Sequence, residues 1–201
     1  MPTPAEITAF DPFEPPEGAN PWVVRPSPAE TIDVVEPDPA WSAAYERLAA
    51  TIRTALGDAV LDLDHVGSTS VPGLPAKPLI DVDLIVADSA DEPAWLPALE
   101  AAGFVLTVRE PWWYEHRCLK FPEPRCNLHV FGPGAAEPVR HRMFRDWLRA
   151  NPQDRDLYRD AKLAAAAASN AAGEHVMEYN ARKEQVIREI YGRAFAAAGL
   201  L

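Results

Sequence analysis

Apolar side chains recur at every third or fourth position between residues 38 and 56. The members of this series are Trp41, Tyr45, Leu48, Ile52 and Leu56. This spacing places them on one face of a helix, where they can pack against a core. Asp38 and Pro39 form a typical helix start, and Gly57 is a typical end. The pattern therefore predicts an amphipathic helix over residues 38–56.

Short apolar or alternating segments predict β-strands, because residues two apart on a strand share a face. The predicted strands cover residues 31–36, 59–67, 79–86, 104–109, 113–121 and 126–131. A capped helix over residues 89–103 separates the third of these strands from the fourth, and prolines mark the later turns. Together these segments indicate a mixed β-sheet with flanking helices.

The pattern is helical beyond Pro138, with helices predicted over residues 139–152, 154–173 and 175–199. The first thirty residues are instead crowded with prolines, which neither sustain helices nor donate to a sheet. The predicted fold class is therefore α+β. Its expected parts are a proline-rich arm at 1–30, an α/β core at 31–136 and C-terminal helices at 137–201 packed on that core.

The charge balance argues against some partners. The chain has 19 lysines and arginines against 30 aspartates and glutamates, a net charge of −11, so nucleic acid is not an expected partner. No apolar run approaches a membrane span and no secretion signal is visible, so we expect a cytoplasmic protein. Cys118 and Cys126 lack metal-ligand spacing, and two reduced thiols are expected.

Two carboxylates occur together on a predicted strand. Asp81 and Asp83 point to one side of it, whereas Ile80, Val82 and Leu84 point to the other. Neighbouring carboxylates repel unless a cation lies between them, and Mg²⁺ favours such oxygen ligands together with substrate phosphates. The alternative is a half-exposed strand whose solvated face is simply acidic.

A glycine turn precedes this strand in the segment HVGSTSVPGLPAKP. Gly67 permits close approach of the backbone to a ligand, and Ser68, Thr69 and Ser70 offer hydroxyl and N–H groups for phosphate oxygens. The turn lacks the lysine and spacing of a Walker A loop, and the dinucleotide pattern GxGxxG is absent from the sequence. The turn predicts phosphate binding of another kind.

Two resemblances follow from these motifs. The first is to the nucleotidyltransferase superfamily with a polymerase-β-like core. Its signature resembles the order found here, in which a hydrophobic residue and Gly-Ser are followed, about a dozen residues later, by Asp-hydrophobic-Asp-hydrophobic. The chain also resembles the GrpB (glutamate-rich protein) family. The matching segments are HVGSTSVPGLPAKPLIDV, NLHVF, FRDWLRANPQDRDLYRDAK and YNARK. This second resemblance extends from about Trp41 to Tyr191 and leaves the proline-rich arm outside.

The resemblance implies a nucleotidyltransferase-like core and roles for single residues. Gly67 and Ser68 would form the phosphate loop, with Thr69 and Ser70 supporting it. The aspartate pair would bind Mg²⁺, which neutralises triphosphate charge. Lys77 would be a further phosphate contact or, alternatively, a surface lysine that lies over the turn.

The strand RCNLHVF departs from the superfamily pattern. A third carboxylate usually stands on this strand, but here the matching face carries Asn127 and His129. His129 is a candidate metal ligand or general base, or alternatively a core histidine. Glu115 could replace the missing acid if its strand is adjacent, and His65 could orient the loop or simply pack.

The C-terminal helices offer three further candidates. Lys162, Tyr179 and Lys183 match positions shared with the family, and Tyr179 and Lys183 lie on one helical face. They could bind the triphosphate and stack a base. The alternative is an ordinary amphipathic helix on which a lysine lies beside a tyrosine.

These residues together predict a Mg²⁺-dependent enzyme that binds a nucleoside triphosphate, ATP by expectation. It would transfer a nucleotidyl group to a small-molecule acceptor, or activate the acceptor with it as an adenylating ligase does. Asp81, Asp83 and His129 are the predicted catalytic residues. One alternative is a nucleotide-binding regulatory module without transfer activity, and another is a metal-dependent phosphohydrolase that uses His129.

Overall fold

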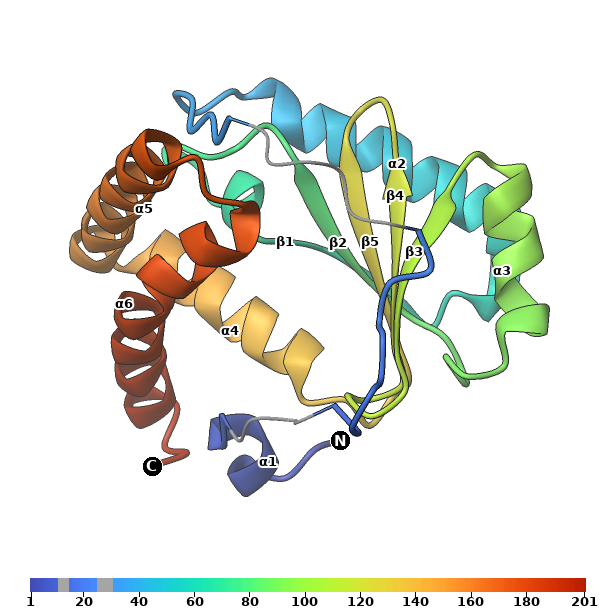
Figure 1. The fold of residues 1–201 in the computed structure, drawn as a ribbon. Helices are drawn as coiled ribbons and strands as arrows, with labels where there is room; N and C mark the ends of the chain where they lie inside the picture. The colour runs from blue at the N-terminus through green and yellow to red at the C-terminus, as the bar shows by residue number, and fades with distance from the viewer. Residues whose placement is uncertain (11–14, 25–30) are drawn as a thin grey trace.

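The computed structural model describes residues 1–10, 15–24 and 31–201. Within these residues a mixed β-sheet has helices on both faces (Figure 1). The strands are β1 (Asp62–Val66), β2 (Ile80–Ile85), β3 (Val105–Glu110), β4 (His116–Phe121) and β5 (Cys126–Phe131). The α-helices are α1 (Pro4–Thr8), α2 (Ala40–Leu56), α3 (Glu92–Ala101), α4 (Glu137–Ala150), α5 (Pro152–Ala172) and α6 (Val176–Ala197), with 3-10 turns η1 (Gly57–Ala59) and η2 (Ser68–Ser70). The predicted α+β fold class is confirmed.

The strands lie in the order β1-β2-β5-β4-β3. β2 and β5 are parallel, and the other neighbours are antiparallel. The register pairs Asp81 with Asn127 and Asp83 with His129. Because side chains opposite one another in register share a face, these four polar residues project from the same side of the sheet.

The other side of the sheet forms the main core. Ile80, Val82 and Leu84 are at most 2% exposed and pack in one cluster with Leu48 of α2 and Trp95 of α3. Full burial of such a side chain stabilises a fold by about 1.5–3 kcal/mol. The predicted inward and outward sides of β2 are thus confirmed, and the polar side faces α4, α5 and α6 (Figure 1).

The three C-terminal helices are anchored on the loop that follows β1. Leu148 of α4, Tyr158 of α5 and Ile190 of α6 form a second buried cluster with Val71 and Leu74 of that loop. The glycine turn is therefore held between the sheet and the helices, which brings residues more than a hundred positions apart to one place.

The proline-rich arm differs from its prediction. It contains the short helix α1, because Thr3 and Glu6 form a reciprocal capping box and Pro4 occupies the first turn. Further on, Trp22 pairs with Val108 and so extends the edge of the sheet beside β3. The described part of the proline-rich arm thus contains a short helix and a β-bridge. The predictions for residues 11–14 and 25–30 lie outside the described residues.

Two strand predictions were wrong in extent. Residues 31–36 form only an isolated bridge, Val35 to Ala76, because their neighbour is a loop and not a strand. The predicted strand 113–121 begins at His116, since Tyr114 and Glu115 adopt φ values of 52° and 50° in the turn after β3. Such left-handed positions cannot continue a strand.

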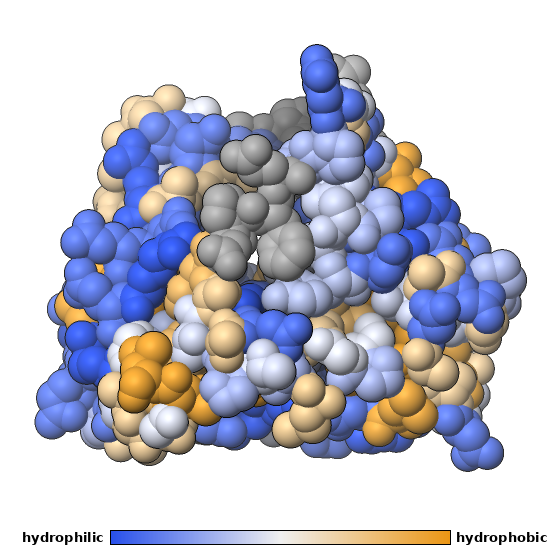
Figure 2. Space-filling view, turned by 90° about the horizontal axis from the view of Figure 1, so that it is seen from below, coloured by the Kyte–Doolittle hydropathy of each residue, from blue (hydrophilic) through white to orange (hydrophobic). Residues whose placement is uncertain are grey.

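One face of the molecule is mostly polar (Figure 2). The face shown in Figure 2 is largely hydrophilic, and its apolar residues lie in small separate groups. Among the described helices, none combines the length and apolar character needed to cross a membrane.

Candidate functional site

Gly67 lies directly against the carboxylate of Asp81. Its φ is 68°, and a Cβ at this position would lie 2.9 Å from Cβ of Asp81 and closer still to Oδ2. Only glycine accommodates both the backbone conformation and this approach. The predicted phosphate loop and the predicted metal-binding strand are thus in direct contact.

The hydroxyl groups of the turn divide between two tasks. Thr69 Oγ1 donates to the carbonyl of Leu79 at 3.1 Å, and Ser70 Oγ donates to the carbonyl of Gly67 at 2.6 Å. Both side chains are buried, so they brace the loop, which is the supporting role expected of them. Ser68 is half-buried, and its side chain hydrogen-bonds with Tyr158 of α5.

Asp81 is held by side chains of β5. Its Oδ1 accepts a hydrogen bond from Nδ2 of Asn127 at 3.0 Å, and Nε2 of His129 lies 3.9 Å away. Burial alone would raise the pKa of Asp81, but the neighbouring His129 and Asn127 outweigh it and hold that pKa below its usual value. Asp81 is therefore an anion.

Asp83 has a different partner, contributed by α4. Nδ1 of His141 lies 2.9 Å from Oδ2 and 3.1 Å from Oδ1 of Asp83, which is only 2% exposed. Burial opposes the charge of His141, yet contact with Asp83 and Glu137 raises its pKa to about 10. The two carboxylates thus each face a different histidine.

His129 belongs to a chain of side chains that crosses β4 and β5. Its Nδ1 lies 3.0 Å from Nε2 of His116, whose Nδ1 lies 2.8 Å from Oε2 of Glu110. Burial lowers the pKa of His116 to about 4, so this ring is neutral. The pattern is satisfied when His116 donates to Glu110 and His129 donates to His116, leaving Nε2 of His129 toward Asp81.

Neighbouring acidic groups raise the pKa of His129. Burial works against protonation, but Cys118, Asp81 and Asp83 together hold the pKa well above its usual value. His129 is therefore an imidazolium beside Asp81 while no other cation is bound. Its position next to the predicted metal ligands agrees with the expectation, and its catalytic role stays a prediction.

Three lysines lie close to one another near the rings of Tyr158 and Tyr179. Nζ of Lys183 lies 4.1 Å and Nζ of Lys77 lies 5.3 Å from the centre of the Tyr179 ring. Lys162 donates from Nζ to the carbonyl of Pro75 at 2.6 Å. All the predicted nucleotide-binding residues are thereby brought to one region.

These lysines lie in a poorly solvated place that disfavours their charged form. Lys162 is 2% and Lys183 is 8% exposed, and burial together with the neighbouring ammonium groups lowers their pKa values to about 7 and about 8. Within the described residues, none of the salt bridges involves Lys77, Lys162 or Lys183. Buried charges are ordinarily paired, so this cluster is suited to an anionic ligand.

His65 and Glu115, two further candidates from the sequence, make contacts that hold the fold together. His65 stacks on Tyr45 and contacts Oγ1 of Thr69 at 3.1 Å, and burial lowers its pKa to about 4. Glu115 pairs with Arg117, whose guanidinium also binds Glu92 of α3 on the core side. Glu115 therefore does not supply the missing carboxylate. Both cysteines are free thiols, as expected.

The donor set bears on which ion could bind. In the described part of the chain, no group of three or more His, Cys, Asp or Glu side chains is arranged to hold a metal by itself. The two aspartates offer oxygens beside the glycine turn, and Mg²⁺ commonly completes its six ligands with water and phosphate oxygens. The residues present fit Mg²⁺ that is bound jointly by protein and ligand.

Four polar residues of this region were not predicted from the sequence. Glu137 and His141 lie one turn apart on α4, and Glu110 and His116 lie at the two ends of the β3–β4 turn. Strand parity could have indicated His116, because it shares a face with Cys118, which is paired with His129. Nothing local could have indicated His141, since its partner Asp83 is 58 positions away.

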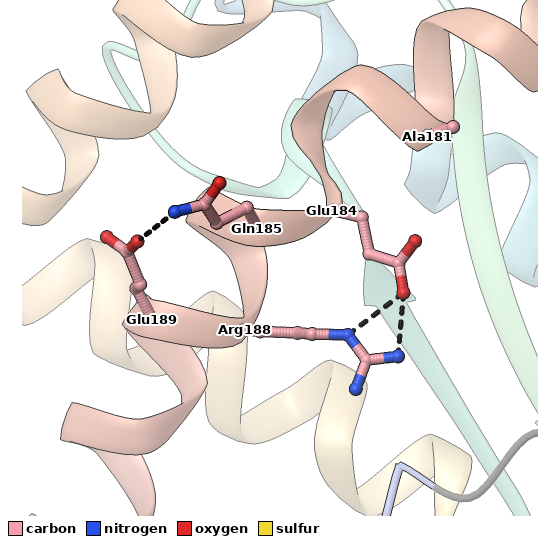
Figure 3. Close-up of a pocket in the computed structure, with 5 residues that line it drawn as sticks. All are labelled: Ala181, Glu184, Gln185, Arg188 and Glu189. Carbon is pink, nitrogen blue, oxygen red and sulfur yellow. Dashed lines mark hydrogen bonds and ion pairs between the residues drawn. The ribbon is translucent and has the colours of Figure 1, made fainter.

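A separate surface hollow lies on α6 and carries none of these residues. It is lined by Ala181, Glu184, Gln185, Arg188 and Glu189 (Figure 3). Arg188 donates to Glu184, and Gln185 donates to Glu189, so its polar groups pair with one another. The hollow is open and adds nothing to the candidate site.

Comparison with known proteins defines the class first by fold. The crystal structure of conserved protein GrpB from Enterococcus faecalis has a similar fold, with a TM-score of 0.71 and 29% sequence identity. The similarity covers 83% of this chain and 99% of that one. A sequence profile of the GrpB protein family matches residues 31–193, and the chain belongs to this family.

Several relatives are similar over most of this chain. A UPF0157 protein of Halalkalibacterium halodurans is 47% identical over 83% of this chain and 84% of its own. A UPF0157 protein of Streptomyces coelicolor is 42% identical over 80% of this chain and 82% of its own. A dephospho-CoA kinase of Mycolicibacterium paratuberculosis is 30% identical over 82% of this chain, but the match spans 46% of that protein.

Proposed function

We propose that this GrpB protein binds a nucleoside triphosphate with Mg²⁺ and transfers its nucleotidyl group to a small-molecule acceptor. The observation that carries the proposal is the meeting of two oppositely charged groups at one glycine turn. Asp81 lies against Gly67, and the lysine cluster (Lys77, Lys162 and Lys183) lies near enough to Asp81 for the opposite charges to interact. A metal–triphosphate ligand has the complementary pattern of charge.

The roles follow from position. Asp81 and Asp83 would hold Mg²⁺, which when bound neutralises phosphate charge and orients the leaving group. Ser68 and the backbone of the turn would bind phosphate oxygens, and the lysine cluster would hold the rest of the chain. Binding of this kind supplies orientation, which accounts for a large part of catalysis in phosphoryl and nucleotidyl transfer.

His129 would receive the proton of the acceptor at Nε2. The raised pKa of this ring depends in part on the Asp81 and Asp83 carboxylates, so compensation of their charge by another cation lowers that pKa toward the ordinary value. A neutral Nε2 can then accept a proton, with the neutral His116 holding Nδ1. This arrangement would replace the third carboxylate that Asn127 does not supply.

The relatives give coarse support. The name of one relative is dephospho-CoA kinase, and a kinase uses a phosphoryl donor. The activity is that of the named protein, of which this chain matches 46%. Its name is consistent with nucleotide chemistry in proteins that contain a GrpB-like part.

The test is isothermal titration of ATP into the protein with Mg²⁺ and with EDTA. We expect binding only with Mg²⁺, and Asp81→Asn should weaken it at least tenfold, which corresponds to about 1.4 kcal/mol. Asp58→Asn is the matched control, since Asp58 is exposed in the turn η1 that follows α2. Binding that is indifferent to Mg²⁺ and to Asp81 would contradict the proposal.

A regulatory nucleotide-binding module is the second candidate, and the amide of Asn127 at the third-carboxylate position favours it. Pyrophosphate release in the presence of candidate acceptors separates the two, because only the transferase produces it. Release of orthophosphate or a nucleoside monophosphate without acceptor would instead indicate a phosphohydrolase that uses His129.

A further inference from the structure

One face of α4 connects the candidate site to the N-terminal arm. Glu137, Arg140 and His141 are three and four positions apart and therefore share that face. His141 Nδ1 reaches Asp83, and its Nε2 lies 3.4 Å from Oε1 of Glu137. The other oxygen of Glu137 accepts from Nη1 of Arg140.

Arg140, the last side chain of this series, donates hydrogen bonds to the backbone of the arm. Its Nη2 donates to the carbonyls of Glu6 and Ala9, both at 2.6 Å, and its Nε donates to the carbonyl of Ile7 at 2.8 Å. These carbonyls lie at the C-terminal end of α1, where a helix leaves its acceptors without internal partners. The buried guanidinium therefore caps α1 while it pairs with Glu137.

Apolar contacts hold α1 in place. Ile7 is 7% exposed and packs in a cluster with Ala136, Tyr191 and Phe195. Phe10 stacks on Phe195, with ring centres 5.8 Å apart. Figure 1 shows α1 beside the end of α4 that follows β5, on the side of the C-terminal helices. The arm is thus docked where it can fix the first turn of α4.

The side chains of the series are joined by direct contacts. Arg140 pairs with Glu137, and His141 lies within reach of both Glu137 and Asp83. Loss of one member leaves its neighbour with a buried, uncompensated charge, which is strongly unfavourable. A displacement of α1 therefore acts on Arg140 first and on Glu137 and His141 in turn.

We propose that Glu137 and Arg140 are positioning residues that hold His141 on Asp83, and that docking of α1 completes this arrangement. The family profile begins at residue 31, so the device includes a segment outside the family match. Its importance for activity rests on the proposed function, because Asp83 is a metal ligand only in that proposal. The connection from Ile7 to His141 itself does not depend on it.

The experiment records ring ¹⁵N spectra of the full-length protein labelled at its five histidines, without nucleotide or metal. Arg140→Met breaks the series at its centre, and Ile7→Asp undocks α1 while leaving Arg140 intact. We expect both variants to shift the ring nitrogen signals of His141 and to leave those of His65 unchanged. A general loss of structure would move His65 as well, because His65 is buried between Tyr45 and Thr69.

Glu137→Gln covers the case in which either variant fails to fold, since it keeps the size of the side chain. It should shift the Nε2 signal of His141 in a folded protein. Arg182→Met is the matched control, because Arg182 pairs with Glu174 away from this series. An unchanged His141 spectrum in a folded Ile7→Asp, Arg140→Met or Glu137→Gln variant overturns the proposal.

A second readout separates this inference from the proposed function. If both hold, Arg140→Met weakens Mg²⁺-dependent ATP binding several-fold while Arg182→Met does not. If the wild-type protein binds no Mg²⁺–ATP, the proposed function fails, and the His141 spectra still decide whether α1 reaches Asp83.

Discussion

Gly67 meets two constraints at once, and another glycine of the same loop meets only one. Both Gly67 and Gly73 have positive φ, at 68° and 78°. A Cβ at Gly73 would meet no atom within 4 Å, whereas at Gly67 it would enter the space of Asp81. The pair therefore separates backbone strain from a side-chain clash.

We predict that Gly67→Ala lowers the free energy of unfolding more than Gly73→Ala does. A positive φ costs an alanine roughly 1–3 kcal/mol at either position, and overpacking against Asp81 adds about 1–3 kcal/mol at position 67 alone. Urea denaturation of the two variants and the wild type measures the difference. Equal losses would mean that Asp81 does not lie against the turn.

The buried ammonium of Lys162 makes stability depend on pH. Burial lowers its pKa to about 7, below the ordinary value of 10.5 that applies when the chain is unfolded. Between these two values the unfolded chain binds more protons than the folded one, so folding becomes more favourable as pH rises. Below about pH 7 both states are protonated, and the full cost of the buried charge is present.

Lys162→Met should therefore remove this contribution to the pH dependence of the free energy of unfolding. The wild-type protein should gain stability relative to the variant from pH 7 to pH 10, by at most about 1.4 kcal/mol per pH unit. Urea denaturation at three pH values in this interval checks it, with Lys120→Met as the control because Lys120 is exposed. A pH-independent difference would show that Lys162 titrates normally.

At the scale of elements, segment 31–36 is held by a side chain of α5. Asn170 accepts from the amide of Ile32 through Oδ1 at 2.8 Å and donates from Nδ2 to the carbonyl of Ile32 at 3.1 Å. Ile32 also packs on Tyr179. This amide side chain takes the place of the neighbouring strand that the predicted strand lacks.

We predict that Asn170→Ala speeds amide hydrogen exchange at Ile32 at least tenfold. Both hydrogen bonds disappear, and each contributes about 0.5–1.5 kcal/mol. The amide of Val35 bonds to Ala76 and should keep its protection. In Asn170→Asp the acceptor remains, so Ile32 should stay protected. Unaltered exchange at Ile32 in the alanine variant would contradict this account.

Elements with a regular period could be predicted, because their signal is local. The apolar series of α2 and the alternation of β2 each lie within one stretch of sequence, and both elements were placed within a few residues. Segment 31–36 has the composition of a strand but no strand to pair with. Helix α1 departs from the prediction because the Thr3–Glu6 capping box stabilises a helical turn among the prolines.

At the scale of the whole molecule, one part of the candidate site could be predicted from a local motif, and the other part could not. The glycine turn and Asp81 and Asp83 lie in one short segment, so their contact could be foreseen from the motif. The partners of those carboxylates come from β5 and α4, 46 and 58 positions away. Only the folded chain shows that His141 faces Asp83, because no periodicity links residues on separate elements.

The docking of α1 also bears on how the protein is made. Ile7 leaves the ribosome long before its partners Tyr191 and Phe195 of α6. At ordinary rates of translation the interval between them is roughly ten to forty seconds. During that time the arm lacks its contacts with α6, and the apolar side chain of Ile7 stays available to chaperones. Completion of the arm's contacts is therefore a step that follows synthesis of α6.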